Sequence, residues 1–457
     1  MIDNTKDFET KPIAPLLWQY AIPAIITQII ASIYNVCDRM FLGQCVGPLA
    51  IAGLAVTMPM MNIIHAFGSL VGAGAGARMS IVLGKRDIKW AENILGNTML
   101  LTFLFGCIYV PVWYVFSDKI LGMFGATAQT IAYAKEYMNI VMPGMFLTTL
   151  TFNLTNLIRS SGYSQRSMWI MVTGALVNIA LDALFIYVFD WGIAGAAWAT
   201  TLSMGLSAFL AILHFVQKSS FIRYRKHAWK PRFYIFRNIL AIGISPFSMN
   251  VAGSAVVALL NTQLLRYGGD NAVAANGIAH SFGPLVIMLM IGICQGMQPI
   301  AGYNYGAGKL DRLREVFTLS LKWNMGAGVV GTLLVLAIPR LLARAFTTDA
   351  DLLDLCEPCL RLTLCMAPLI GFIITSSQLF QSIDKPWIAI VNSLSRQVLI
   401  LTPMMYIVPT IFEDMGWNGL LGVYTSCSVS DFLGASVAAY LLYRQRHLLW
   451  PKTAEKA

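Results

Sequence analysis

Long apolar stretches recur along the whole chain, and they constrain its fold more than any other feature. A run of about 20 mostly apolar residues can cross the hydrocarbon core of a bilayer as one helix. Twelve such runs can be placed, beginning near Pro15, Leu49, Ile94, Tyr133, Ser167, Gly192, Asn238, Val273, Val316, Leu355, Trp387 and Gly419. The chain has 457 residues, of which 57% are hydrophobic and only 12% charged. We therefore expect an all-α membrane protein with twelve transmembrane helices.

The two halves of the chain repeat one pattern. An offset of 224 residues, without a gap, pairs Gly53 with Gly277, Gly68 with Gly292, Gly72 with Gly296, Gly84 with Gly308, Lys85 with Lys309 and Asp87 with Asp311. An offset of 222 pairs Phe124 with Phe346 and one of 225 pairs Pro143 with Pro368, so the register drifts by a few residues. Each half holds six runs, so both enter the membrane in the same sense and would form two six-helix bundles related by a pseudo-two-fold axis along the membrane normal. The predicted organisation is an N-terminal lobe (1–217), a basic cytoplasmic linker (218–237), a C-terminal lobe (238–443) and a cytoplasmic tail (444–457).

The net charge of +10 follows the predicted topology and does not indicate nucleic acid binding. If the amino terminus is cytoplasmic, most Lys and Arg residues fall in cytoplasmic loops and tails, which is the asymmetry that orients helices during insertion. The linker from Lys218 to Arg237 is strongly basic and contains no acid. We expect it to lie on anionic lipid, with both termini in the cytoplasm and no cleaved signal peptide.

Two acids stand out because they fall inside apolar runs, Asp38 in the first and Asp182 in the fifth. Each costs about 2.5 to 3.5 kcal/mol to insert at a helix centre, so a functional role is expected. Asn178 lies four residues before Asp182 and therefore on the same helix face. Two neighbouring carboxyl groups in an apolar setting disfavour each other's charge, so a proton could be taken up and released there. The structural alternative is that Asp38 only pairs with Arg39 or Arg78.

Arg396 and Asp431 fall near the middle of the last two apolar runs. Opposite charges at this depth most simply neutralise one another, so we expect a structural ion pair. A substrate-binding or gating role for the pair is the alternative.

Several segments together resemble the multidrug and toxic compound extrusion (MATE) family over essentially the whole chain. They are Tyr34–Gly43, Gly76–Asp87, Asn178–Asp182, Gly192–Ala197 and Gln298–Ala307. Their order and spacing are specific, whereas any single one would be weak. Three further segments are similar to the bacterial branch that contains the MepA-type exporters: Asn304–Ala307, Ser395–Gln397 and Ser430–Asp431.

The resemblance implies a secondary active antiporter that exports cationic or amphipathic organic compounds in exchange for H⁺ or Na⁺ by alternating access. It implies a monomer in a bacterial plasma membrane, with no cofactor beyond the coupling ion. The matching residues Asp38, Asn178, Asp182 and Thr200 would form a cation-coupling pocket in the first lobe, with Tyr34 one turn before Asp38. Carboxylate, amide and hydroxyl oxygens would equally suit a hard cation, so a Na⁺ site at Asp38, Asn178 and Asp182 stays open beside a proton site.

A promiscuous cationic substrate favours a cleft with thioether and aromatic side chains. We consider three residues as possible cleft residues, namely His65, His280 and Met297.

Other classes fit the sequence less well. A lipid or oligosaccharide-lipid flippase of the same superfamily is the main alternative, but it would show a strongly cationic cleft, whereas the buried charge of the first half is mostly acidic. A major-facilitator transporter would carry an Asp- and Arg-rich signature between its second and third helices, which this chain lacks. An enzyme would need metal-binding carboxylates or paired His residues. The nearest carboxylate run, Asp349 to Asp354, falls in a predicted outer loop, so we expect no enzyme activity.

Overall fold

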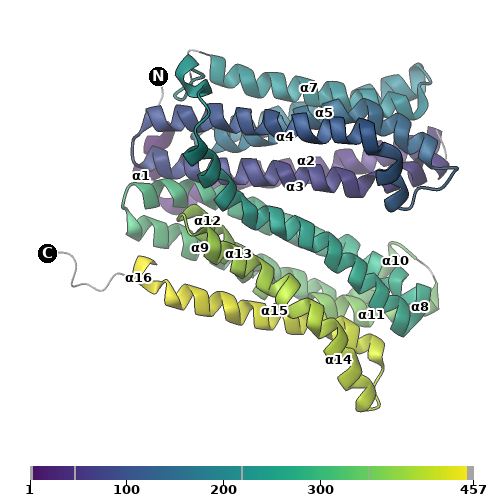
Figure 1. The fold of residues 1–457 in the computed structure, drawn as a ribbon. Coiled ribbons are helices and arrows are strands. Elements are labelled where there is room, and N and C mark those ends of the chain that lie inside the picture. Colours follow the sequence, from purple (N-terminus) through teal and green to yellow (C-terminus); the bar gives the residue numbers. More distant parts are fainter. Residues whose placement is uncertain (1–3, 46–47, 218–219, 348, 450–457) are drawn as a thin grey trace. The chain divides into compact units, whose positions relative to one another are not determined.

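The structure, a computed structural model, describes residues 4–45, 48–217, 220–347 and 349–449, and nearly all of them are helical (Figure 1). The first part of the chain contains η1 (Asn4–Lys6), α1 (Asp7–Thr10), α2 (Ile13–Cys45), α3 (Pro48–Gly84), α4 (Ile88–Met123), α5 (Ile131–Ser160), α6 (Ser164–Asp182), η2 (Ala183–Val188), α7 (Gly192–Val216) and η3 (Lys226–Trp229). The remainder contains α8 (Phe233–Gly306), α9 (Leu310–Ala337), α10 (Pro339–Arg344), α11 (Ala350–Leu364), α12 (Ala367–Ser382), α13 (Pro386–Leu394), η4 (Ser395–Leu401), α14 (Thr402–Asp414), α15 (Gly419–Arg444) and α16 (Arg446–Leu449).

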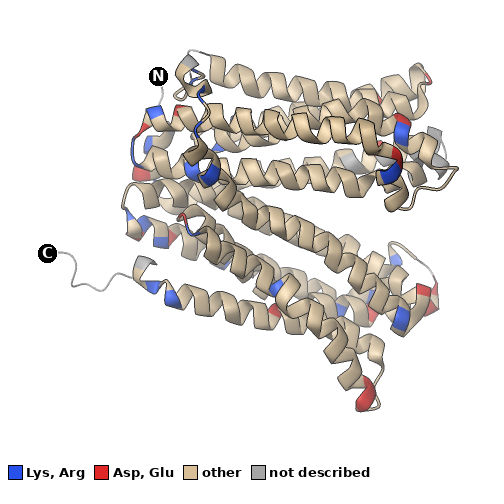
Figure 2. Ribbon diagram, viewed as in Figure 1, with Lys and Arg blue, Asp and Glu red and all other residues tan. Residues whose placement is uncertain are grey.

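The long helices agree with the twelve apolar runs. Within the described ranges, nine helices are long and apolar enough to cross a membrane, and ten if the bent pair α11 and α12 forms one span. One of the nine, α8, has 74 residues and a break at Gly269, where φ is 65°. A helix of that length would extend about 110 Å, so α8 supplies two crossings of the bilayer. With α8 counted as two crossings and the bent pair as one, these helices account for eleven of the twelve runs. The twelfth run is α5, which is 30 residues long but carries many Thr and Asn residues. Figure 2 shows that charged residues lie mainly near helix ends and in turns.

By internal packing the chain forms two units. The first contains Ile22–Phe247 with the chain up to Lys11 and Gly302–Ala307. The second contains Pro12–Ala21, Ser248–Ala301 and the chain from Gly308 onward. The long helices α2 and α8 each contribute to both units, whereas the predicted lobes were divided at the linker. The lobe boundaries from the sequence repeat therefore stay a prediction.

The turns between helices show the true register of the internal repeat. Between α3 and α4 the residue with positive φ is Arg86, at 58°, and between α8 and α9 it is Gly308, at 72°. These residues are 222 positions apart, and so are the helix ends on either side of them. The offset of 224, which paired Gly84 with Gly308, is therefore wrong by two residues at this turn. The reason is that matching residue types can recur at shifted positions, whereas the turn requires its left-handed residue at one fixed position, and this residue is Arg86 in one turn and Gly308 in the other.

A buried hydrogen bond repeats in both halves with its two residue types exchanged. In the first unit, Asn153 Nδ2 on α5 donates to Thr102 Oγ1 on α4 at 2.7 Å. In the second unit, Asn324 Nδ2 on α9 donates to Thr375 Oγ1 on α12, also at 2.7 Å. At the offset of 222, Thr102 corresponds to Asn324 and Asn153 to Thr375. A buried amide needs a partner, and the exchange keeps one amide and one hydroxyl at each contact.

An apolar cavity of about 170 Å³ marks a difference between the halves. It lies in the second unit, and its lining includes Gly331 and Val335 of α9. At the offset of 222 these residues correspond to Tyr109 and Trp113 of α4, which are buried, Trp113 completely. The second half therefore has a cavity where the first half has two aromatic side chains.

Replacing Val335 with Phe is expected to stabilise the protein by about 1 kcal/mol, because cavity-filling changes commonly gain that much. The measurement is the Tm of purified protein in detergent, which should rise. The matched control is Leu333→Phe, because Leu333 lies on the same helix, is 60% exposed and does not line the cavity. A lower Tm for Val335→Phe would show that the site is overpacked and that the cavity cannot accept a ring.

Candidate functional site

Three helices of the first unit bring the predicted coupling residues together. Tyr34 and Asp38 lie one turn apart on α2, Asn178 and Asp182 lie one turn apart on α6, and Thr200 lies on α7. Asn178 Nδ2 donates a hydrogen bond to Thr200 Oγ1 at 3.4 Å, which joins α6 to α7. Asp38 and Asp182 are near enough to interact electrostatically, so α2 and α6 each contribute one acid to the same region.

Asp182 is the most isolated acid of the group. Its side chain is 0% exposed, and neither of its carboxylate oxygens has a hydrogen-bond partner among the described residues. It is the last residue of α6, and the π-helical segment η2 follows directly. π-Helical turns often mark functional sites, because the widened turn changes the direction of the side chains near it. A buried carboxyl group without protein partners is the arrangement expected of an ion-binding group.

The structure adds Tyr137 of α5 to this group, and sequence reasoning missed it. Tyr137 is only 2% exposed and shares a side-chain hydrogen bond with Thr200. It also interacts electrostatically with Asp38, Asp182 and Tyr34. The helix contains several other aromatic residues, so nothing in its local sequence distinguishes this tyrosine from a packed core residue. We call Tyr34, Asp38, Tyr137, Asn178, Asp182 and Thr200 the acid cluster.

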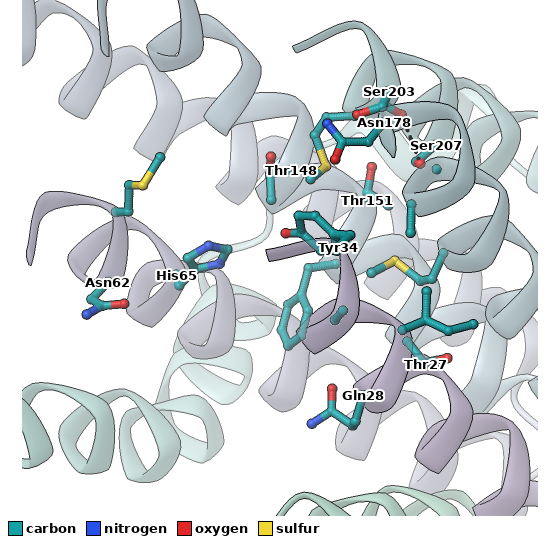
Figure 3. Close-up of a pocket in the computed structure, with 18 of the residues that line it drawn as sticks. Thr27, Gln28, Tyr34, Asn62, His65, Thr148, Thr151, Asn178, Ser203 and Ser207 are labelled. Carbon is teal, nitrogen blue, oxygen red and sulfur yellow. Dashed lines mark hydrogen bonds between the residues drawn. The ribbon is translucent and has the colours of Figure 1, made fainter. Parts of the chain in front are cut away.

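A cavity of about 480 Å³ opens beside the acid cluster within the same unit (Figure 3). Its lining comes from α2, α3, α5, α6 and α7 and includes Tyr34 and Asn178, which also belong to the acid cluster. The polar lining residues labelled in Figure 3 are Thr27, Gln28, Tyr34, Asn62, His65, Thr148, Thr151, Asn178, Ser203 and Ser207. Four methionines and Phe152 complete much of the remaining surface.

The cavity itself carries no formal charge from Asp, Glu, Lys or Arg, as far as its described lining shows. The nearest acids follow its lining residues by one helical turn, Asp38 after Tyr34 and Asp182 after Asn178. One turn corresponds to about 5.4 Å along a helix axis, so both carboxyl groups lie just beyond the cavity wall. The site therefore combines a neutral, adaptable chamber with an acidic pair at its edge.

Local sequence explains how α6 packs closely enough to form this wall. A Cβ atom on Gly174 would overlap the Oγ atom of Ser207 on α7, so glycine accommodates the serine hydroxyl at this close approach. Ser207 Oγ in turn donates to the carbonyl oxygen of Ser203 at 3.0 Å, which turns its hydroxyl along its own helix. Asn178 follows Gly174 by one turn and is thereby directed at Thr200.

In the second unit, Arg396 Nε and Asp431 Oδ1 form an ion pair between η4 and α15. The Asp431 side chain is 0% exposed and that of Arg396 21% exposed. Ser430 Oγ also donates to the carbonyl oxygen of Arg396 at 2.7 Å, so the two helices are tied at this level. The contact agrees with a structural ion pair, and the gating alternative stays open.

The remaining sequence-based candidates lie in different environments. His65 lines the cavity, His280 is exposed in the second unit, and Met297 is fully buried. Arg78, an alternative partner for Asp38, is half-buried on α3. The side chain of Arg39, the other alternative, lies outside the described residues.

Comparison with known proteins places the chain in a family. The chain matches the sequence model of the MatE family over residues 23–184 and 231–407. It is 27% identical over 453 residues to the multidrug export protein MepA of Staphylococcus aureus. The aligned region covers 98% of this chain and 97% of that protein.

Solved structures share the fold. The outward-facing conformation of a multidrug resistance MATE family transporter of the MOP superfamily matches with a TM-score of 0.90 and 22% identity, covering 98% of this chain and 99% of that one. A MOP superfamily transporter from Pyrococcus furiosus, described as having a binding pocket of reversed polarity, matches with a TM-score of 0.89 and 22% identity, covering 97% and 98%. These identities are low enough that the likeness concerns the fold alone. Because the family model spans most of both halves, the chain belongs to the MATE family of multi-pass membrane transporters.

Proposed function

We propose that this transporter is a secondary active antiporter that exports cationic or amphipathic organic compounds in exchange for H⁺ or Na⁺. The carrying observation is that the cavity and the acid cluster share Tyr34 and Asn178. A coupling ion bound by the acids and a substrate held in the cavity would therefore act on the same two residues. The similarity to MepA, named as a multidrug export protein, supports this class of substrate.

The acid cluster supplies the coupling group. An ionised carboxylate that is buried without partners is costly, so Asp182 is stable when it holds a proton or a cation. Asp38 adds a second carboxyl group, and the side-chain oxygens of Asn178, Thr200 and Tyr34 complete a set that suits either ion. Tyr137 holds Thr200 in position through their shared hydrogen bond. Release of the ion leaves uncompensated charge, and the transporter is then driven to another conformation or to bind a substrate cation.

The cavity supplies the substrate site. Methionine side chains adapt to ligands of different shape, and the faces of Tyr34 and Phe152 attract cations. The absence of Lys and Arg from the described lining disfavours the flippase alternative, which would need positive charge to hold an anionic headgroup. We further place both termini in the cytoplasm of a bacterial plasma membrane and expect the monomer to be the working unit.

Proteoliposomes that contain the protein are expected to accumulate ethidium only under an imposed ion gradient. Parallel samples with a proton gradient, a sodium gradient, both and neither identify the coupling ion, because only a gradient of that ion should drive uptake. Collapse of the gradient with an ionophore and liposomes without protein are the controls. Equal uptake with and without any gradient would contradict coupled antiport while leaving the family assignment unaffected.

A further inference from the structure

The linker before α8 is clamped to the first turns of α4. The side chain of Glu92 is 6% exposed and accepts from Arg225 Nε at 3.1 Å, with His227 Nε2 at 3.3 Å. Asn97 Nδ2 donates to the carbonyl oxygen of Lys230 at 3.3 Å, and Asn97 Oδ1 accepts from the backbone N–H of Arg232 at 2.8 Å. These contacts hold the segment from Arg225 to Arg232 in one conformation.

Glycine makes this docking possible. A Cβ atom on Gly96 of α4 would overlap the carbonyl oxygen of Ala228, whose own side chain is fully buried. The bonds to Asn97 use backbone atoms of Lys230 and Arg232, so they do not depend on the side chains at these two positions. The linker is thus fixed by its backbone and by Glu92.

The outward side of the clamped segment and of the first turns of α8 combines basic and aromatic side chains. We call this surface the basic–aromatic belt, and its residues are Trp229, Lys230, Arg232, Phe233, Tyr234 and Arg237. The three aromatic side chains are strongly exposed, Phe233 at 82%, Tyr234 at 59% and Trp229 at 46%. The three basic side chains are exposed as well, and Figure 2 shows Lys and Arg residues as blue ribbon near the start of α8. On the opposite side of the same turns Ile235 and Ile239 are buried, so the exposed face is distinct from the packed one.

Two contacts connect the belt to α4. The guanidinium group of Arg232 lies 5.8 Å from the centre of the Trp90 ring, and the rings of Trp90 and Tyr234 lie 6.0 Å apart. The rings of Trp90 and Tyr234 therefore form a continuous aromatic surface from α4 to α8, which we call the aromatic ledge, and the positive charge of Arg232 lies beside it. Segment 217–241 contains no acid that would neutralise this charge internally.

We infer that the basic–aromatic belt binds the anionic headgroups of the bilayer and so couples the stability of the first unit to anionic lipid. Exposed aromatic rings at the start of a spanning helix are most stable at the membrane–water interface. Each basic side chain near an anionic leaflet adds attraction, and three on one fixed ledge act together. Charge complementarity thus selects anionic phospholipid as the partner, in preference to zwitterionic lipid.

The test compares the Tm of the protein in nanodiscs of phosphatidylcholine with and without added phosphatidylglycerol. We expect phosphatidylglycerol to raise Tm in the unmodified protein, and the rise to fall by at least half in the double variant Lys230→Gln and Arg232→Gln. The glutamines keep the backbone bonds to Asn97, so the linker should remain docked. The rise should also shrink at high salt, because the belt is exposed to solvent ions.

The matched control is Lys119→Gln at the other end of α4. Lys119 also lies beside a ring, 6.0 Å from the centre of Phe116, and it should leave the lipid-dependent rise unchanged. Inorganic phosphate added to phosphatidylcholine nanodiscs should not reproduce the rise, because the aromatic ledge requires a membrane surface. An equal rise in the double variant and the unmodified protein, or full replacement of the lipid by phosphate, would overturn the inference.

Discussion

Exchange of Asp182 for Asn is expected to reduce gradient-driven ethidium uptake to the level of protein-free liposomes. The amide has nearly the shape of the carboxyl group but cannot release a proton and binds cations weakly. Because Asp182 is buried without hydrogen-bond partners in the described structure, the change removes no hydrogen bond of the folded chain. The Tm should therefore stay the same or rise, while transport is lost.

Two further variants test whether the loss of transport is specific to the acid cluster. Asp118→Asn makes the same chemical change on α4, where Asp118 is exposed and pairs with Lys135 at 2.7 Å, and it should transport normally. Asp38→Asn should lose transport as Asp182→Asn does, because both acids belong to the acid cluster. Normal, gradient-dependent uptake by Asp182→Asn would sink the coupling assignment, even though the MATE fold would stand.

The sequence predicts the architecture well because hydrophobic length is a local property. Each predicted run has a helix, including α5, whose Thr and Asn residues lower its hydropathy. The buried acids were equally visible, because an ionisable residue inside an apolar run is conspicuous by composition alone. Tyr137 was not, because its importance comes from its contact with Thr200 on another helix, which no local pattern encodes.

The second half has apolar residues at two positions that correspond to members of the acid cluster. At the offset of 222, Asp38 and Tyr137 correspond to Leu260 and Cys359, both of which are buried in one apolar cluster of the second unit. A cluster of this kind stabilises its unit by packing and offers no ligand oxygens to an ion. The two halves thus share their helix geometry, as the exchanged Asn and Thr hydrogen bond shows, but differ at the position of the acid cluster.

The close approach of α3 and α8 has a glycine on each side, and the same contact recurs in the second unit. A Cβ atom on Gly74 would overlap the carbonyl oxygen of Ile239, and one on Gly243 would overlap that of Leu70. In the second unit a Cβ on Gly296 would lie 2.6 Å from the backbone nitrogen of Ala21. The pairs Gly74 with Gly296 and Ala21 with Gly243 are each separated by the offset of 222, so this contact belongs to the repeated design.

Gly243→Val is therefore expected to lower transport by at least tenfold and to lower the Tm, because a branched side chain cannot occupy space filled by a backbone carbonyl. Backbone cannot move aside as a flexible side chain can, so α3 and α8 must separate and lose buried area, at a cost of about 1 to 3 kcal/mol. The matched control is Gly277→Ala on α8, where a Cβ atom meets nothing within 4 Å. There the Tm should rise slightly, since alanine favours a helix over glycine by roughly 0.5 to 1 kcal/mol. Unchanged transport and Tm in Gly243→Val would mean that the working protein does not need this contact, and that the close approach is not part of its transport cycle.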